Sequence, residues 1–494
     1  MSRGMSPPPS AVIVVGLGHG DEGKGRTVDA LVRKNRADLV LRYNGGPQAA
    51  HHVVSPDGRR HCFSQLGAGS FVEAVGTAIA GTVAFDPLSW HLEARVLAEA
   101  GVPTHPFTPG LFTVDPGSVV VTPYHRLLNR AMETQRGAGR HGSCGMGVGV
   151  AVLDAERGGM PVVRVADLFV PDALEQRVSL LRLMCLDRAE QLVDLGSCES
   201  RDALAVFIAA LRNYPAELYV RSIAAVVEVL GETGCEPASA RLERHPIVVC
   251  EGAQGALLDR YGGYFPYCTP SPTTGANARA LLADSGRNVR TVGVLRAYST
   301  RHGAGPLTTE CPALLRRVPA DDNPTGPWQG AMRVGWFDAV AARYGVELDG
   351  HIDEIALTSA DRIAGLGKGR IARAYEYRGP GGELDAFFEV ERSGGRILLT
   401  RLKVLDEPTL QALAARTKLL GACEPIYDEL DLWPKSDWRL ERPRGHRALD
   451  AFVELLQRPD VLGRPVSSVG FGPRAADTLW LGDAGPGRAS VTRG

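Results

Sequence analysis

The sequence predicts an α/β protein: one large subunit with a central, mostly parallel β-sheet flanked by helices. Residues 11–17 (AVIVVGL) form a continuous apolar run, which is typical of a strand buried on both faces. A glycine-rich turn, a helix-like segment over residues 25–36 and a second apolar run over residues 38–43 follow in that order. Strand, helix and strand in close succession indicate a βαβ unit.

Further apolar runs alternate with helix-like segments along the chain, which supports the same architecture. We expect additional strands at residues 118–121, 246–250, 291–295 and 354–357. We expect helices at residues 88–100, 176–195 and 201–213. The 58 glycines and 33 prolines predict long loops, and such loops commonly carry functional residues.

One catalytic domain is expected over residues 11–480, between a Pro-rich stub at 1–10 that we expect to be disordered and a Gly-rich flexible tail at 481–494. The net charge of −1, without a basic block, argues against non-specific nucleic-acid binding. The sequence shows no signal peptide, no apolar run of the roughly 18 residues that span a membrane, and no C-x-x-C pair. We therefore expect a cytoplasmic protein with reduced thiols and no membrane partner.

The loop after the first expected strand carries the clearest functional signal. Residues 18–25 (GHGDEGKG) contain the G-x-x-x-x-G-K spacing of a loop that cradles phosphate with backbone N–H groups and a helix N-terminus. Gly25 stands where such loops carry the Ser or Thr that binds Mg²⁺. Asp21 is a substitute oxygen ligand of the kind that Mg²⁺ prefers. The alternative is a glycine-rich turn that binds nothing.

This loop resembles the GDEGKGK signature of adenylosuccinate synthetases. Other segments resemble further motifs of that family in the same order: 42–51 (RYNGGPQAAH), 123–128 (PYHRLL), 142–149 (GSCGMGVG), 251–255 (EGAQG), 264–274 (YFPYCTPSPTT), 300–306 (TRHGAGP) and 424–433 (EPIYDELDLW). Enzymes of this family convert GTP, IMP and aspartate to adenylosuccinate, GDP and phosphate. The resemblance implies a homodimeric, GTP-dependent ligase that phosphorylates the purine 6-oxygen and then replaces it with an amine.

The resemblance also implies roles for individual residues. Asp21 is implied as the base that removes the purine N1 proton and, with the backbone carbonyl of Ala50, as a Mg²⁺ ligand. His51 is implied to stabilise the transferring phosphoryl group, and Gln254 to hold the 6-oxygen. The implied GTP contacts are Gly20, Glu22, Gly23, Lys24 and Gly25 at the phosphates, and Asp361, Gly470 and Gly472 at the base. The implied acceptor contacts are Asn44, Ser143, Cys144, Arg157, Thr269, Thr325 and Arg333.

The acceptor half departs from the family pattern, whereas the nucleotide half largely follows it. Met146 replaces an arginine of the phosphate loop for IMP, and Arg333 is the one basic residue left in the loop at 325–336. Each lost charge-assisted contact is worth about 1.5–3 kcal/mol. Ser359 replaces a lysine next to Asp361, which leaves the preference for GTP over ATP open. The open alternatives are a paralogue of specialised metabolism with a modified purine nucleotide or another amine, and a non-catalytic GTP-binding protein.

Overall fold

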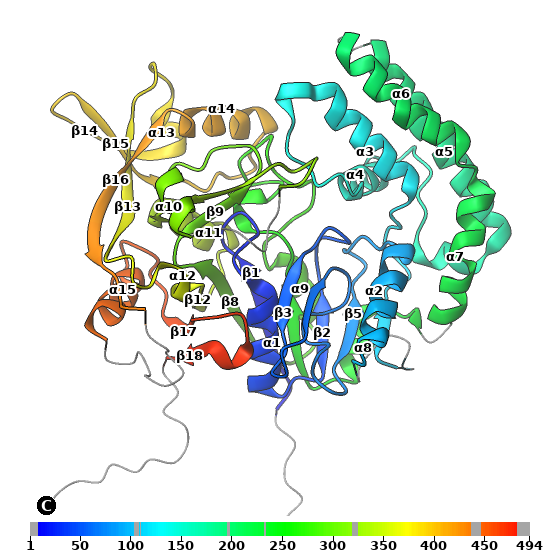
Figure 1. Cartoon of the computed structure of the whole chain (residues 1–494), viewed down its shortest axis with the longest axis horizontal. Coiled ribbons are helices and arrows are strands. Elements are labelled where there is room, and N and C mark those ends of the chain that lie inside the picture. Colours follow the sequence, from blue (N-terminus) through cyan, green and yellow to red (C-terminus); the bar gives the residue numbers. More distant parts are fainter. Residues whose placement is uncertain are drawn as a thin grey trace, which may run out of the picture.

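The computed structural model describes residues 8–102, 108, 110–194, 198–231, 234–318, 325–435 and 446–481. Within this part of the chain, the central sheet has nine strands in the order β18-β17-β12-β8-β1-β7-β2-β5-β6 (Figure 1). Its strands are β1 (Ser10–Gly16), β2 (Leu39–Arg42), β5 (Gly76–Ile79), β6 (Phe112–Val114), β7 (Ile247–Glu251), β8 (Asn288–Arg296), β12 (Glu354–Thr358), β17 (Val466–Gly470) and β18 (Thr478–Trp480). All neighbours are parallel except β17 and β18. The predicted fold class is confirmed.

β1 lies near the middle of this sheet, between β7 and β8. Its residues from Ala11 to Gly16 are buried, as the continuous apolar run predicted. Because the strands are parallel, the loops that follow β1, β7, β8 and β12 all leave the same edge of the sheet. Ligands of such open α/β sheets bind at this carboxyl edge.

Helices cover the sheet and form an additional lobe. Those near the sheet and the second sheet are α1 (Lys24–Asn35), α2 (Pro87–Glu99), α8 (Ala238–Glu243), α9 (Ala276–Leu282), α10 (Pro312–Arg317), α11 (Ala339–Asp349), α12 (Ala360–Ile363), α13 (Leu384–Phe387), α14 (Leu410–Leu420) and α15 (Arg447–Gln457). α1 packs on β1, β3 and β7. Its residues from Lys24 to Val32 are all buried, and Val28, Leu31 and Val32 belong to the apolar core of the sheet.

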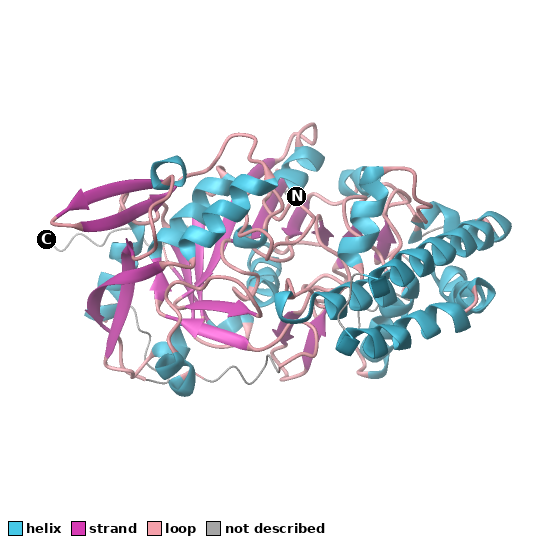
Figure 2. Cartoon of the chain, turned by 90° about the horizontal axis from the view of Figure 1, so that it is seen from above, coloured by secondary structure: helices cyan, strands magenta, loops and turns pink. Residues whose placement is uncertain are grey.

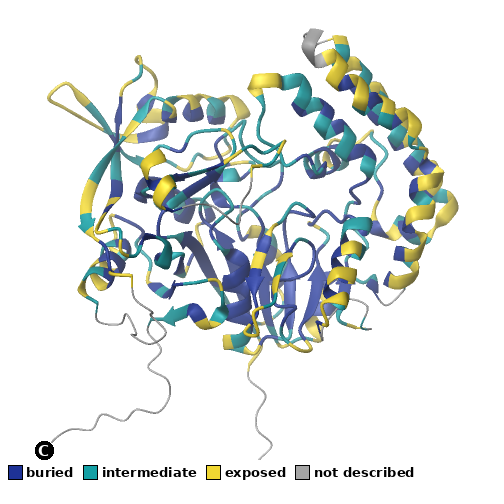
Figure 3. Ribbon diagram, viewed as in Figure 1, coloured by how far each residue is buried: buried dark blue, intermediate teal, exposed yellow. Residues whose placement is uncertain are grey.

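The lobe contains α3 (Pro123–Arg136), α4 (Val148–Arg157), α5 (Pro171–Asp194), α6 (Cys198–Asn213) and α7 (Ala216–Leu230). Figures 1 and 2 show these helices together at one end of the molecule, and Figure 3 shows their outer faces exposed and their inner faces buried. The helices expected at 88–100, 176–195 and 201–213 are confirmed as α2, α5 and α6. No helix in the described ranges is long and apolar enough to cross a membrane.

A second sheet lies at the other end of the molecule (Figure 2). It contains β11 (Phe337–Asp338), β13 (Lys368–Tyr377), β14 (Phe388–Ser393), β15 (Arg396–Leu402) and β16 (Cys423–Asp431). It has its own apolar cluster, which includes Tyr344, Tyr375 and Leu399. The sequence analysis did not predict this sheet.

Two short two-stranded sheets stand outside both larger sheets. β3 (His51–Val54) pairs with β4 (Arg60–Phe63), and β9 (Ser299–His302) pairs with β10 (Met332–Gly335). The prediction of a strand at residues 118–121 was wrong. Val119 and Val120 make only isolated bridges, because the chain runs past them between loops and enters α3 after Thr122.

The expected terminal segments fall mostly outside the described residues. Residues 1–7 and 482–494 are not described, and Ser10, which the sequence analysis assigned to the stub, begins β1. The extent of one catalytic domain over 11–480 stays a prediction.

Candidate active site

The phosphate-type loop holds a buried ion pair. α1 begins at Lys24, after Gly23 adopts the left-handed conformation with φ 86°. The ammonium of Lys24 lies 2.9 Å from Oε2 of Glu22 and donates to the Gly20 carbonyl at 2.7 Å. The Gly20 N–H donates to Oε1 of Glu22 at 2.6 Å. The Glu22 carboxylate therefore takes two donors that a bound phosphate would otherwise engage.

Gly25 lies directly against the backbone of His51. A Cβ atom at Gly25 would lie 2.8 Å from Cβ of His51 and 2.9 Å from its carbonyl carbon. No side chain fits at this position without displacing β3. This contact gives a physical reason for the missing Ser or Thr after Lys24, and it joins the phosphate loop to an implied catalytic residue.

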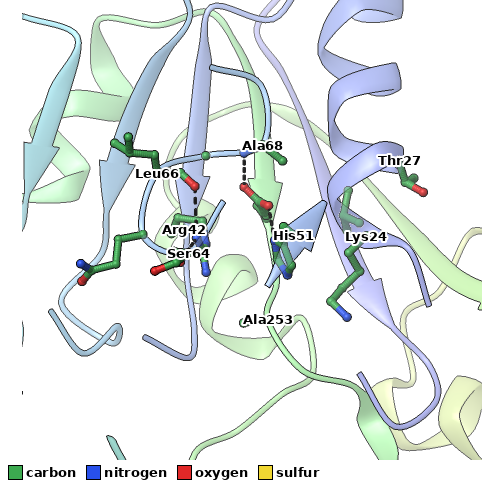
Figure 4. Close-up of polar contacts among 12 residues, drawn as sticks. Lys24, Thr27, Arg42, His51, Ser64, Leu66, Ala68 and Ala253 are labelled. Carbon is green, nitrogen blue, oxygen red and sulfur yellow. Dashed lines mark hydrogen bonds and ion pairs between the residues drawn. The ribbon is translucent and has the colours of Figure 1, made fainter. Parts of the chain in front are cut away.

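A buried carboxylate holds the imidazole of His51. Nδ1 of His51 is hydrogen-bonded to Glu251, at the end of β7, and the second oxygen of Glu251 accepts from the Ala68 N–H at 2.9 Å. Burial would raise the pKa of Glu251, but the contact with His51, the Arg42 guanidinium and the Ala68 hydrogen bond lower it. Burial lowers the pKa of His51. Figure 4 shows His51 between the side chains of Arg42 and Lys24.

Gln254 is held in a strained conformation with an unused amide oxygen. Its φ is +63°, a left-handed conformation that is costly for a residue other than glycine. Oε1 is buried and has no hydrogen-bond partner within the described part of the chain. The side chain of Asn44 secures this loop: Oδ1 accepts from the Ala253 N–H at 2.6 Å, and Nδ2 donates to the carbonyls of Ala253 and Pro272. Here Asn44 contacts backbone, and its implied substrate contact stays a prediction.

Asp21 is half-buried at the carboxyl edge of the sheet. Burial raises the pKa of its carboxyl, and the nearby Arg296 guanidinium opposes this shift. Nε of Arg296, at the end of β8, donates to the backbone carbonyl of Asp21. Ala50 is exposed in the loop before β3, and its implied role as a metal ligand stays a prediction.

The implied base site gathers around Asp361, in the first turn of α12. Burial raises the pKa of this carboxyl, and Arg26 is the main neighbouring cation that lowers it. A Cβ at Gly470 would lie 1.8 Å from Nη1 of Arg26, and one at Gly472 would lie 2.4 Å from Oδ2 of Asp477. A side chain at either implied nucleotide-binding glycine would therefore have to displace a buried charged group.

The base site is joined to the phosphate loop through Thr358. Its hydroxyl, at the end of β12, donates to the backbone carbonyl of Glu22 at 2.5 Å. A Cβ at Gly23 would lie 3.3 Å from the same hydroxyl oxygen. The strand that carries Asp361 thus supports the loop that carries Lys24.

The implied acceptor residues are only partly brought together. Ser143 is hydrogen-bonded to Asn129, which also accepts from the Gly147 N–H. The hydroxyl of Thr269 lies 3.2 Å from that of Ser271. Burial raises the pKa of the Cys144 thiol. Arg157 and Thr325 are exposed.

Arg333 faces Arg301 across the β9–β10 hairpin. Its guanidinium donates to Glu310 at 2.8 Å and to the Gly305 carbonyl at 2.5 Å. The alternative to a substrate contact is that Arg333 only pairs with a surface carboxylate such as Asp338. Glu310 is the carboxylate that it pairs with, whereas Asp338 is buried and caps α11. Arg301, an arginine outside this loop that could complete the acceptor site, is buried and donates to three backbone carbonyls.

Comparison with known proteins decides the family. The family model for adenylosuccinate synthetase matches residues 13–479. The chain belongs to the adenylosuccinate synthetase family.

Curated relatives span almost the whole chain. The adenylosuccinate synthetase of Pelotomaculum thermopropionicum is 30% identical over 475 residues, which cover 95% of this chain and 98% of that protein. The one from Mycobacterium sp. (strain KMS) is 31% identical over 484 residues, which cover 95% and 97%. As a member of the adenylosuccinate synthetase family, the chain is a GTP-using ligase of purine nucleotide biosynthesis, as predicted.

Two solved structures share the fold. The fully ligated adenylosuccinate synthetase of Plasmodium falciparum is 20% identical, with a TM-score of 0.67 and coverage of 95% of this chain and 99% of that one. The cyanophage S-2L succinoaminodeoxyadenylate synthetase, bound to dGMP and dATP, is 16% identical, with a TM-score of 0.53 and coverage of 96% and 95%. At these identities the likeness concerns the fold alone.

Sequence reasoning missed several residues of this adenylosuccinate synthetase site. The family motifs imply no role for Arg296 or Arg26. Arg296 is nevertheless the main cation near Asp21, and Arg26 is the main cation near Asp361. Glu251 lies within the motif at 251–255, but the motif did not predict its contact with His51. Gln48 has both amide atoms buried without a partner in the described ranges, next to Gly45 and on the same side as Gln254. The one sequence signal that could have pointed to Gln48 is its position in a loop that departs from the family pattern.

Proposed function

We propose that the chain joins L-aspartate to the 6-position of IMP through a 6-phosphoryl intermediate, at the expense of GTP. The observation that carries this proposal is the contact between Gly25 and His51. It places the start of the phosphate-loop helix against the imidazole that Glu251 orients. A loop that only bound GTP would have no need of this arrangement.

Three side chains divide the chemistry. Asp21 accepts the N1 proton of the purine, and burial, which raises the pKa of its carboxyl, makes it a stronger base. The amide of Gln254, which has no internal partner for Oε1, holds the reacting edge of the purine. His51, with Nδ1 fixed on Glu251, presents Nε2 to the transferring phosphoryl group.

Asp21 and the carbonyl of Ala50 are the proposed protein ligands of Mg²⁺. No group of three or more His, Cys, Asp or Glu side chains within the described ranges is arranged to hold a metal. This fits Mg²⁺, which commonly binds one or two protein oxygens and completes its shell with substrate phosphates and water. The ion would neutralise charge on the phosphates of GTP.

Asp361 is the proposed determinant of GTP. A carboxylate accepts from both the ring N1–H and the exocyclic amine of guanine, and adenine cannot present this pair. We further propose a homodimer in a cytoplasmic location. The exposure of Arg157 at the end of α4 supports a contact with the acceptor phosphate of a partner subunit.

A second candidate is a paralogue that takes a modified purine nucleotide or another amine. The engagement of Arg333 by Glu310 favours it, because a dicarboxylate substrate must compete for that guanidinium. The left-handed Ser359 in place of a stacking lysine also leaves room for a different nucleoside triphosphate.

Phosphate release distinguishes the candidates. Wild type is assayed with GTP or ATP against IMP, GMP and their deoxy forms, each with a panel of amino acids. The proposal expects release only when IMP, aspartate and GTP are all present, and loss of about 10²-fold or more in Asp21→Ala. Faster release with another nucleotide or amine supports the paralogue. Binding of GTP without release under any combination contradicts both and supports a non-catalytic protein.

A further inference from the structure

Two arginines without a carboxylate partner surround one tryptophan in the acceptor half. Cζ of Arg130 lies 5.6 Å from the centroid of the Trp328 ring, and Cζ of Arg140 lies 5.8 Å from it. Nε of Arg130 donates to the Gly145 carbonyl, and Nη1 of Arg140 donates to the Pro327 carbonyl, both at 3.2 Å. Within the described part of the chain, neither guanidinium forms an ion pair.

Trp328 is fixed by the segments around it. A Cβ at Gly145 would lie 2.8 Å from Cδ1 of Trp328, so the indole ring packs directly on the loop at 142–147. The ring of Phe207, in α6, lies 5.8 Å from the Trp328 ring in an edge-to-face arrangement. The tryptophan therefore connects the loop at 325–336 to the helical lobe and holds both guanidiniums near the same short loop.

Positive charge is concentrated on this face of α3. Arg126 and Arg130 are separated by one helical turn, and both lie close enough to Cys144 in this loop for their charges to oppose the rise in the pKa of its thiol. Asp86 and Ser89 bind Arg126, whereas Arg130 receives no such compensation. Burial and the charge of Arg126 lower the pKa of Arg130. Nε of Arg140 is buried without a partner in the described ranges. Such charges are stabilised when an anion binds between them.

The same loop leads directly into a helix. Gly147 is the N-cap of α4, which runs for ten residues from Val148 to Arg157. The N-terminus of a helix carries a partial positive charge and favours a phosphate. Ser143 adds a hydroxyl on the same loop. The resemblance implies Arg333, on β10, for the amino acid, so we assign the anion at this loop to the nucleotide.

We propose that Arg130 and Arg140, positioned by Trp328, bind the 5′-phosphate of the acceptor purine nucleotide. This inference rests on the proposed function and deepens it. The two guanidiniums take the place of the arginine that Met146 replaces in the loop motif. Guanidinium groups bind phosphate oxygens through paired hydrogen bonds, which lysine or a neutral side chain does not reproduce.

Binding measurements separate this inference from the proposed reaction. Isothermal titration calorimetry is run with IMP and inosine, and with GMP and guanosine, on wild type, Arg130→Gln and Arg140→Gln. Arg212→Gln is the control, because Arg212 is an exposed lobe arginine paired with Glu190. We expect each variant to bind the nucleotide at least tenfold more weakly than wild type. Nucleoside affinity and GTP affinity should stay within twofold, and the control should match wild type.

Other outcomes overturn the inference. The phosphate assignment fails if no purine nucleotide binds wild type more tightly than its nucleoside, or if both arginine variants bind IMP as wild type does. It also fails if the variants weaken aspartate but not IMP, which would assign the cluster to a substrate carboxylate. Arg130→Lys should recover part of the nucleotide affinity, and matching thermal unfolding of all variants shows that the fold is intact. Absence of turnover in a wild type that binds IMP contradicts the proposed function and not this inference.

Discussion

The ammonium of Lys24 lies 2.9 Å from the carboxylate of Glu22, and both side chains are buried in the phosphate loop. The Glu22 carboxylate therefore engages two donors, the Lys24 ammonium and the Gly20 N–H, that the family resemblance assigns to the phosphates of GTP.

We expect Glu22→Gln to lower the free energy of unfolding of the nucleotide-free protein by about 3 kcal/mol, since it leaves a buried lysine unpaired. Added GTP should then raise the melting temperature of the variant more than that of wild type, because phosphate restores the missing negative charge. Differential scanning fluorimetry with and without GTP measures both effects. Glu190→Gln, which breaks an exposed pair, is the control. Equal GTP-induced shifts in variant and wild type would refute this reading of Glu22.

Gly25→Ser should lower kcat by about 10²-fold, the usual effect of a displacement of about 1 Å at a catalytic group. The change supplies the hydroxyl of an ordinary phosphate loop, yet its Cβ would collide with His51. Steady-state kinetics and circular dichroism are the measurements. Gly381→Ser is the matched control, because no atom lies within 4 Å of a Cβ there. Activity equal to wild type would show that β3 can shift freely.

Glu251→Gln should reduce kcat by on the order of 10²-fold or more while the KM for GTP stays close to that of wild type. Glu251 acts through His51, since its carboxylate fixes the proton on Nδ1. The pH profile of kcat should also change shape, an effect that lost stability alone does not produce. Partial recovery is expected in Glu251→Asp. A proportional loss at every pH would instead indicate a purely structural role.

Arg333→Ala should raise the KM for the amino acid about tenfold, in line with the loss of one charge-assisted contact, and leave that for GTP unchanged. Glu310→Gln should have the opposite effect, because it releases the Arg333 guanidinium. Kinetics with aspartate and alanine test both variants. If neither variant changes the KM for aspartate, the hairpin does not contact the amino acid.

Asp338 makes folding stability depend on pH. Burial raises the pKa of its carboxyl to about 6 in the folded protein, above the value of about 3.9 expected in the unfolded chain. Its contribution is therefore fully present below about pH 4 and is lost as the pH rises through about 6. Relative to Asp338→Asn, wild type should lose up to about 3 kcal/mol over this interval. Urea unfolding at several pH values measures the difference, and the exposed Asp406→Asn serves as control.

The central sheet and its loops were predictable because parallel strands and glycine loops depend on local sequence. The apolar run at 11–17 and the turn before Lys24 specify β1 and the phosphate loop without reference to distant residues. The strand expected at 118–121 failed for the converse reason: its apolar residues are buried, but no neighbouring strand offers a continuous ladder. Burial alone does not determine pairing.

The contacts within the site were not predictable from motif positions. Glu251 follows His51 by 200 residues, and Trp328 approaches Gly145 from the loop at 325–336, which departs from the family pattern. Arg26 and Arg296 have no distinctive spacing, so their closeness to Asp361 and Asp21 emerges only when the strands are assembled.

The contact between Gly25 and His51 has a thermodynamic consequence. It places α1, which follows the proposed nucleotide loop, directly against β3, which carries the proposed catalytic residue His51. Where binding of one substrate moves one of these elements, the other element moves with it. Linkage requires any resulting change in affinity to be reciprocal: the factor by which GTP changes acceptor binding equals the factor by which the acceptor changes GTP binding.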